Sequence, residues 1–279
     1  MYLLPVIDMN YPQGTRPGEY RYTAPFNFVF GARYGTVPPF VLNSSDQFRP
    51  NAPYAINSRR YTEDYNEIKA LGGDGVVTPS ARTADQTEIA LFWLEASVVG
   101  WNRIARNASG TEGLGLWENA RLFALLNFAL RDGYIGSWEA KYTHNFWRPV
   151  TAIREGNADG NDDTVGDPAW NPLATTPPIP DHDSEHGVAG GAAAEVLGNV
   201  FEGRFFRFRA SSTSLPAGST CGDATPVYRN YASFAQAALE NGLSRIYVGY
   251  HFRRAVTDGI EHGRRIAHRA CQKFLQPVQ

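Results

Sequence analysis

The sequence predicts an all-α fold, a helical bundle that follows a long irregular N-terminal segment. From about residue 60 onward, apolar residues recur at helical spacing between clear start and stop signals. No run of residues has convincing strand character, and no internal repeat is present. Residues 184–201 are rich in Ala and Gly, a composition that lets helices pack closely. Together these observations favour a bundle.

The first 55 residues differ from the rest. They are rich in Pro, Gly, Tyr and Phe and show no helical period. We interpret residues 1–55 as an ordered segment that wraps around the bundle, or as the middle of a larger protein cut at its start. In this interpretation, residues 1–279 are one domain whose bundle occupies 60–275.

The individual helices are expected from local signals. Gly72 and Gly73 end the first helix, and Thr83-Ala84-Asp85-Gln86 resembles a capping box that opens a long second helix through Ile104. A loop dense in Gly, Asp, Asn and Pro and a second loop of Ser, Thr and Gly interrupt the later pattern. The expected helices are 61–71, 84–104, 114–130, 134–155, 184–201, one from about 231, and 245–274, and the two loops are 156–180 and 210–226.

Composition limits the function. The 26 Lys+Arg and 28 Asp+Glu residues give a net charge of −2, so no global basic field would attract nucleic acid or anionic lipid. No window approaches 18 uninterrupted apolar residues, and a membrane span is not expected. Cys221 and Cys271 fit no zinc motif and leave one bridge open. The compartment stays open too, including a secreted or periplasmic location after removal of an upstream signal, as does the oligomeric state.

Three clusters of polar residues carry the chemistry. Lys141 and Arg148 are seven residues apart, about two helical turns, and are expected on one face of a helix whose neighbours are apolar. Buried cations require an anion. In the second cluster, Ser184 begins a helix whose free N–H groups suit an oxyanion, and His186 is a candidate acid/base. In the third, the Arg245 side chain can hold oxyanion oxygens and His251 can attack or coordinate the central atom.

Each cluster alone has an ordinary interpretation, as a solvated basic edge or a capping serine. Together they resemble the signature of the vanadium haloperoxidases and the type 2 phosphatidic acid phosphatase superfamily: KxxxxxxRP, then PSGH, then SRxxxxxH. The first and third motifs match at every fixed position, namely Lys141, Arg148 and Pro149, and Ser244, Arg245 and His251. Residues 82–93 and 144–150 are similar to the haloperoxidase branch. The resemblance covers about residues 20–275, and members usually carry a further helical region upstream, so we expect a fragment or a short form.

The resemblance implies vanadate as cofactor, with phosphate competing for the site. It implies that His251 is the axial ligand and that His186 is the acid/base. Trp138 falls at a halide-pocket position, and Asp85 is a candidate partner that orients a site histidine. The residues that the resemblance assigns to the bound oxyanion are Lys141, Arg148, Ser184, Glu185, His186, Arg245 and His251.

Two activities follow from the resemblance. The first hypothesis is oxidation of halide (bromide, chloride or iodide) by hydrogen peroxide, with Lys141 polarising the peroxide. The alternative is hydrolysis of a phosphate ester, with His251 as nucleophile and His186 as general acid. A third hypothesis is an oxyanion-binding relic without turnover, because Asp183 and Glu185 stand where the family has Pro and Gly. These two carboxylates either turn outward or reduce the affinity for an oxyanion.

The remaining polar residues have ordinary interpretations. His144 is expected to face a neighbouring helix, and His262 and His268 to be exposed on the last helix. His182 either lines the pocket mouth or caps its loop. Asp159 and its neighbours to residue 163 lack the EF-hand glycine and glutamate positions, so they predict a solvated turn rather than a calcium site.

Overall fold

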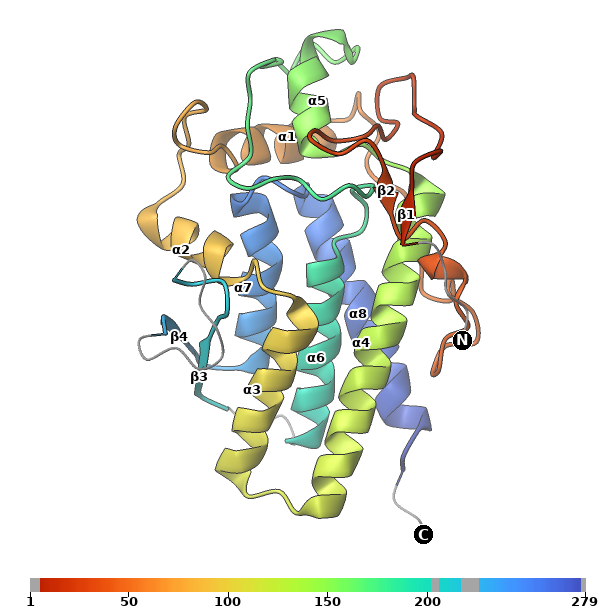
Figure 1. Ribbon diagram of the computed structural model, residues 1–279, viewed down its shortest axis with the longest axis vertical. Coiled ribbons are helices and arrows are strands. Elements are labelled where there is room, and N and C mark those ends of the chain that lie inside the picture. The colour runs from red at the N-terminus through yellow and green to blue at the C-terminus, as the bar shows by residue number, and fades with distance from the viewer. Residues whose placement is uncertain (1–5, 202–205, 217–225, 277–279) are drawn as a thin grey trace.

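Helices dominate the computed structural model, which describes residues 6–201, 206–216 and 226–276 (Figure 1). This confirms the all-α expectation. The α-helices of the described residues are α1 (Arg59–Leu71), α2 (Ala84–Phe92), α3 (Ser97–Glu112), α4 (Leu116–His144), α5 (Pro149–Glu155), α6 (Glu185–Val200), α7 (Phe234–Tyr247) and α8 (Arg253–Lys273). Two 3₁₀ turns, η1 (Tyr34–Thr36) and η2 (Gly156–Ala158), accompany them.

Short strands, which the sequence patterns did not predict, also occur. β1 (Ile7–Asp8) pairs antiparallel with β2 (Val29–Phe30), and β3 (Phe208–Ser211) pairs antiparallel with β4 (Tyr228–Tyr231). Strands of two to four residues are too short for an alternating pattern to stand out in the sequence.

Helix α6 lies at the centre of the bundle and packs against α3, α4, α7 and α8 (Figure 1). Helix α4 runs antiparallel to α6, and α7 runs antiparallel to α8. The end of α4, the start of α6, the end of α7 and the start of α8 therefore meet at one end of the bundle, the upper end in Figure 1. The three sequence motifs lie at these helix ends, so the topology brings them together.

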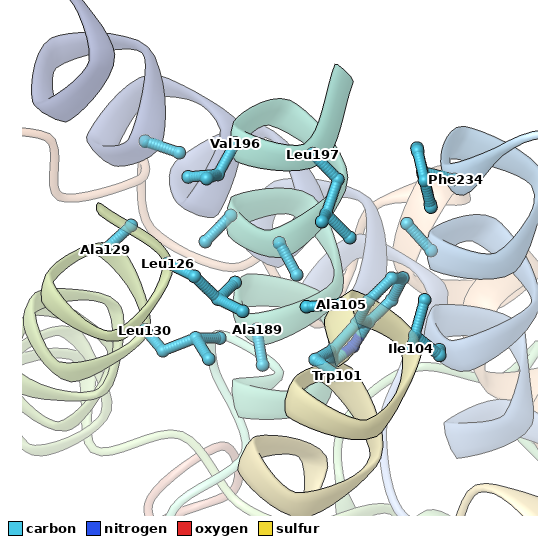
Figure 2. Close-up of a cluster of buried hydrophobic side chains, with 14 of the residues drawn as sticks. Trp101, Ile104, Ala105, Leu126, Ala129, Leu130, Ala189, Val196, Leu197 and Phe234 are labelled. Carbon is cyan, nitrogen blue, oxygen red and sulfur yellow. The ribbon is translucent and has the colours of Figure 1, made fainter. Parts of the chain in front are cut away.

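The main core fills the space between α3, α4, α6 and α7, and Figure 2 shows part of it. Trp101 is fully buried, and its ring stacks on that of Trp93 at a centroid distance of 5.8 Å. Further buried side chains labelled in Figure 2 are Ile104, Ala105, Leu126, Ala129, Leu130, Ala189, Val196, Leu197 and Phe234. This apolar core holds the long helices in register below the site.

Four predicted helices have different bounds. Instead of two helices over 114–130 and 134–155, α4 is continuous to His144, where Asn145 adopts a left-handed conformation (φ 47°). The chain then restarts as α5, with Pro149 in the first turn. Lys141 and Arg148 thus belong to different elements, and the prediction that they share one helix face was wrong. The predicted helix from residue 84 is likewise split into α2 and α3, and the last helix starts at Arg253, so Arg245 belongs to α7.

The N-terminal segment wraps around the upper part of the bundle (Figure 1). The buried Asp132 carboxylate on α4 accepts hydrogen bonds from the backbone N–H groups of Phe40 (2.9 Å), Val41 (2.6 Å) and Leu42 (3.1 Å). Asn145 accepts a backbone hydrogen bond from Tyr20. These contacts fix the segment to α4 without regular structure. Among the described helices, none combines the length and apolar character needed to cross a bilayer.

Candidate functional site

Lys141 is a fully buried cation of the site. Its side chain extends from the last turn of α4 and has no exposed surface. Its ammonium group donates to the carbonyl oxygens of Pro180 (3.2 Å) and Asp181 (3.0 Å), and to that of Asp183. Burial lowers the pKa of Lys141, while the Glu185 carboxylate opposes this shift. Lys141 therefore anchors the loop that leads into α6.

Arg148 lies at the N-cap of α5 and is also fully buried. Its Nε donates to the carbonyl oxygen of Ile179 (2.6 Å) and its Nη1 to that of Tyr250 (3.0 Å). Its Nη2 has no hydrogen-bond acceptor among the described residues. The guanidinium group is thus held in place by backbone oxygens, with one N–H-bearing nitrogen left for another acceptor.

Arg245 repeats this arrangement from the last turn of α7. Its Nη1 donates to the carbonyl oxygen of Trp93 (2.8 Å), and its guanidinium carbon lies 4.9 Å from the ring centroid of Tyr250. Its Nε has no acceptor in the part of the chain that the structure describes. Burial lowers the pKa of Arg245, but a guanidinium group remains charged at neutral pH.

His251 lies in the segment between α7 and α8 and is fully buried. Its Nδ1 is 2.9 Å from Asp181 Oδ1, which identifies Nδ1–H as the donor to that carboxylate. Its Nε2 faces the cations, 2.9 Å from Arg148 Nη1. The ring is therefore oriented by Asp181, with Nε2 presented to the cationic cluster.

His186 lies in the first turn of α6. Its Nδ1 is 2.9 Å from Ser97 Oγ, 3.3 Å from Asn241 Oδ1 and 3.3 Å from Arg245 Nη1. Burial and the charge of Arg245 lower its pKa to about 3. The imidazole is therefore neutral near pH 7 and binds a proton only weakly in the free protein.

Glu185 turns into this cluster. Its Oε2 lies 3.1 Å from Lys141 Nζ and 3.3 Å from His251 Nε2. Burial alone would raise its pKa, but Lys141, His251 and Arg148 lower it well below the ordinary value. The carboxylate is thus negatively charged at the centre of the cationic cluster. Of the two outcomes foreseen for Glu185, the outward orientation is wrong.

Asp183 also points inward, but to other partners. Its Oδ1 accepts from Ser137 Oγ at 2.7 Å, and its Oδ2 lies 2.7 Å from His262 Nδ1. Burial would raise its pKa, yet His262 and Lys141 lower it. The prediction that His262 is exposed was wrong, because this side chain of α8 is buried against the Asp183 carboxylate.

Ser184 is buried and caps α6, with its hydroxyl oxygen 3.4 Å from the backbone nitrogen of Gly187. Its own backbone nitrogen donates to Ala255 at 3.0 Å. Ser184 is therefore a capping serine at the N-terminus of a helix of 16 residues, the end at which a helix favours negative charge.

Trp138 lies one turn before Lys141 on α4 and is nearly buried among aromatic rings. Its ring is 5.6 Å from that of Tyr134 and 5.8 Å from that of Tyr34, and its Nε1 donates to the carbonyl oxygen of Phe30 at 3.3 Å. The Glu185 charge contributes to the raised pKa of Tyr134, whose main cause is burial.

Asp85 does not lie at the site. Its side chain is 68% exposed and its Oδ1 accepts from Arg229 at 3.0 Å. The prediction that it orients a site histidine is therefore wrong, because the carboxylate belongs to the first turn of α2, at the molecular surface. Asp181 orients His251 instead, and Ser97 and Asn241 contact His186.

These three partners were missed because they share no spacing with the motifs. Asp181 belonged to the quoted loop, but nothing in the string distinguished it from its acidic neighbours. Ser97 and Asn241 reach His186 only through the packing of α3 and α7 on α6.

The other predicted features lie outside the cluster. His144 contacts the Pro50 carbonyl oxygen (3.1 Å), and its ring lies 5.3 Å from that of His182. His182 is buried on the Asn51 carbonyl oxygen, so it does not line a pocket mouth, and His268 is half exposed as expected. Cys221 lies outside the described residues, so whether it forms a bridge with Cys271 stays open. Within the described residues, no group of three or more His, Cys, Asp or Glu side chains could hold a metal ion.

The donor set fits an oxyanion. The buried cations Lys141, Arg148 and Arg245 lie in one region with His251 Nε2. Both guanidinium groups keep one nitrogen without an acceptor in the described residues. Buried N–H groups without acceptors indicate a ligand that supplies oxygens. The Glu185 carboxylate already forms an ion pair with Lys141 (3.1 Å), as a bound anion would, so an oxyanion fits only when this side chain moves aside.

Comparisons with known proteins agree with this chemistry. The chain is 27% identical over 308 residues to vanadium chloroperoxidase of Curvularia inaequalis, covering 90% of this chain and 49% of that protein. It superposes on the first bacterial vanadium-dependent iodoperoxidase of known structure with a TM-score of 0.79 and 28% identity, over 97% of this chain and 65% of the other. A holo-type bacterial vanadium-dependent chloroperoxidase has the same fold, with a TM-score of 0.71 at 15% identity, over 93% of this chain and 61% of the other.

The chain spans about half the length of the chloroperoxidase and less than two thirds of each of these solved structures. The family model of the VCPO second helical-bundle domain matches residues 121–279, more than half of the chain and the part that carries the three motifs. The chain therefore belongs to the vanadium haloperoxidase family, as a relative of its second helical-bundle domain.

Proposed function

We propose that this chain is a vanadium-dependent haloperoxidase-type enzyme that oxidises halide with hydrogen peroxide when vanadate is bound at His251. One observation carries the proposal: His251 Nε2 lies 2.9 Å from Arg148 Nη1 and shares the Glu185 carboxylate with Lys141, and Arg148 and Arg245 each keep one buried nitrogen without an acceptor in the described residues. Membership in the family supports vanadate as the oxyanion that these groups hold.

Lys141, Arg148 and Arg245 would bind the oxygens of vanadate, and the N-terminus of α6 with Ser184 would add favourable partial charge. His251 would supply the ligand nitrogen, Nε2, because Asp181 holds the opposite side of the ring. Bound vanadate supplies a Lewis acid that makes hydrogen peroxide a stronger oxidant toward halide. The protein groups contribute positive charge that is already in place before the reaction.

His186 would accept and return protons at this site. Its pKa in the free protein, about 3, is too low for this role, but the negative charge of a bound oxyanion would raise it. Its Nδ1 is occupied by Ser97. Proton transfer would therefore use Nε2. Trp138 and Tyr134 would form the aromatic wall near which halide binds.

The test is turnover of hydrogen peroxide with bromide, chloride or iodide after loading with vanadate. His251→Ala is expected to lose activity by about 100-fold or more, because it removes the ligand nitrogen itself, and losing even a group that supports a ligand costs about 10–100-fold. His268→Ala, at a half-exposed histidine on α8, is the matched control and is expected to keep full activity.

Vanadium NMR on the same samples separates binding from turnover. Activity that requires vanadate and disappears in His251→Ala supports the proposal. Vanadate that is demonstrably bound to the wild-type chain without any halide-dependent turnover contradicts it.

A phosphatase is the second candidate, because the same geometry suits a nucleophile. Asp181 orients His251 so that Nε2 points to the cations that would stabilise a phosphoryl group. Hydrolysis of p-nitrophenyl phosphate in the absence of vanadate tests it. Loss of hydrolysis in His251→Ala but not in His268→Ala would favour this candidate, and inhibition by vanadate would place hydrolysis at the same site.

A further inference from the structure

Glu185 touches the atoms that an oxyanion would need. Its Oε2 lies 3.1 Å from Lys141 Nζ and 3.3 Å from His251 Nε2, the nitrogen that the proposed function assigns to the ligand. Nε2 is also 2.9 Å from Arg148 Nη1. An oxyanion bound to the same three groups would overlap the carboxylate.

The backbone at Glu185 is held in place. The preceding residue, Ser184, donates its N–H to the Ala255 carbonyl oxygen at 3.0 Å, and a Cβ built at Gly259 would come within 2.6 Å of the Ser184 carbonyl oxygen. The start of α6 is therefore pressed closely against α8. Only rotation of the Glu185 side chain can move its carboxylate out of the cluster.

The side chain also lies between the cluster and solvent. The Glu185 side chain is 10% exposed, whereas those of Lys141 and His251 have no exposed surface. A rotation toward solvent is thus open to Glu185, while the cations remain where backbone carbonyls hold them.

We propose that Glu185 is a built-in anionic competitor: its carboxylate occupies the oxyanion site and must rotate away before vanadate or phosphate can bind. The inference rests on the proposed function for the identity of the oxyanion. It assigns Glu185 a role opposite to that of a cofactor ligand. The side chain offsets part of the positive charge of the free protein, and it lowers the affinity of the site by charge repulsion and by volume.

Isothermal titration with orthovanadate and with inorganic phosphate tests this on the full chain. Glu185→Gln removes the charge and Glu185→Gly removes charge and volume, so both are expected to bind at least about tenfold more tightly than wild type. Glu185→Asp keeps the charge and is expected to bind more weakly than Glu185→Gln. Glu261→Gln, which removes a carboxylate from an exposed pair on α8, is the control and is expected to match wild type.

Thermal unfolding provides a second measurement. Glu185→Gln and Glu185→Gly remove the carboxylate that pairs with Lys141, so the buried ammonium group loses this counter-charge. Glu185→Gln is expected to melt earlier than wild type in anion-free buffer and to recover with saturating phosphate. Wild type is expected to gain less from phosphate. Circular dichroism shows whether each variant is folded before titration.

The outcomes are distinct. Glu185→Gln and Glu185→Gly that bind both anions no more tightly than wild type, and that gain no more from phosphate in melting, would overturn the inference. Tighter vanadate binding in these variants without halide-dependent turnover would leave the inference standing and would contradict the proposed function instead.

Discussion

Asp183 and Glu185 are two residues apart, yet the start of α6 directs them to different partners. Glu185 faces Lys141 and His251, whereas Asp183 faces Ser137 and His262. The first pair of contacts can be exchanged for an incoming anion. The contacts of Asp183 with Ser137 and His262 are fully buried, so water cannot replace the carboxylate as a hydrogen-bond acceptor there.

Asp183→Ala tests whether the buried contacts of Asp183 stabilise the fold. It removes the acceptor from the Ser137 hydroxyl and from His262 Nδ1, both buried, and is expected to lower the free energy of unfolding by about 3 kcal/mol. Urea unfolding followed by circular dichroism measures the change. Asp162→Ala is the control: it removes a carboxylate that is exposed to solvent in a loop, and it is expected to change stability by less than about 0.5 kcal/mol. Equal stability of the two variants would show that Asp183 is not structurally required.

At the scale of elements, the closest contact in the bundle is that between α6 and α8. Glycines allow it, because a Cβ at Gly263 on α8 would clash with the Val188 carbonyl oxygen, and one at Gly191 on α6 would clash with the Ile260 carbonyl oxygen. The same approach places the start of α6 against α8 and so sets the position of Ser184 and Glu185.

Gly263→Ala is therefore expected to be destabilising, by about 1–3 kcal/mol, because the added methyl forces two helix backbones apart. Gly110→Ala on α3 is the matched control: no heavy atom lies within 4 Å of the added Cβ, and alanine is expected to stabilise that helix by about 0.5–1 kcal/mol. Chemical denaturation of the two variants and of wild type measures the sign of each change in the free energy of unfolding. A neutral Gly263→Ala would mean that α8 can move away from α6 freely.

The sequence predicted where helices occur more accurately than it predicted the residues at which they begin and end. The apolar period and the capping box at Thr83 predicted helices that the structure contains, because these signals are local. The break at Asn145 was not predicted, although Asn145 and Pro149 are residue types that end and restart helices. The left-handed residue is also stabilised by a tertiary contact, the backbone hydrogen bond from Tyr20, which the sequence does not show.

At the scale of the whole molecule, Lys141, Arg148, Arg245 and His251 come together although Lys141 and Arg148 do not share a helix. The motifs predicted the residue types of the cluster through the family resemblance, and the antiparallel packing of α4, α6, α7 and α8 brings them to one end. The direction of the Glu185 and Asp183 side chains could not be predicted, because it depends on cations from distant segments.

Stability against pH is a property of the whole chain, and buried His182 makes a defined contribution to it. Burial lowers the pKa of His182 from 6.5 to about 4. On acidification, His182 is therefore protonated near pH 6.5 in the unfolded chain but only near pH 4 in the folded chain. The stability contributed by neutral His182 is full above about pH 6.5 and is lost as the pH falls toward the folded value.

His182→Gln removes this titration, so its stability is expected to fall less than that of wild type on acidification. Between about pH 7 and about pH 5, the difference in unfolding free energy between the two proteins should change by about 2 kcal/mol in favour of the variant. Asp64 and Asp258, whose pKa values burial raises to about 6, act in the opposite direction, but they are present in both proteins and largely cancel in the comparison. Urea unfolding at the two pH values measures the difference, with the half-exposed His268→Gln as the control for loss of a histidine. A difference that stays constant with pH would mean that His182 takes up its proton equally in the folded and unfolded chains, and that its burial is not maintained in solution.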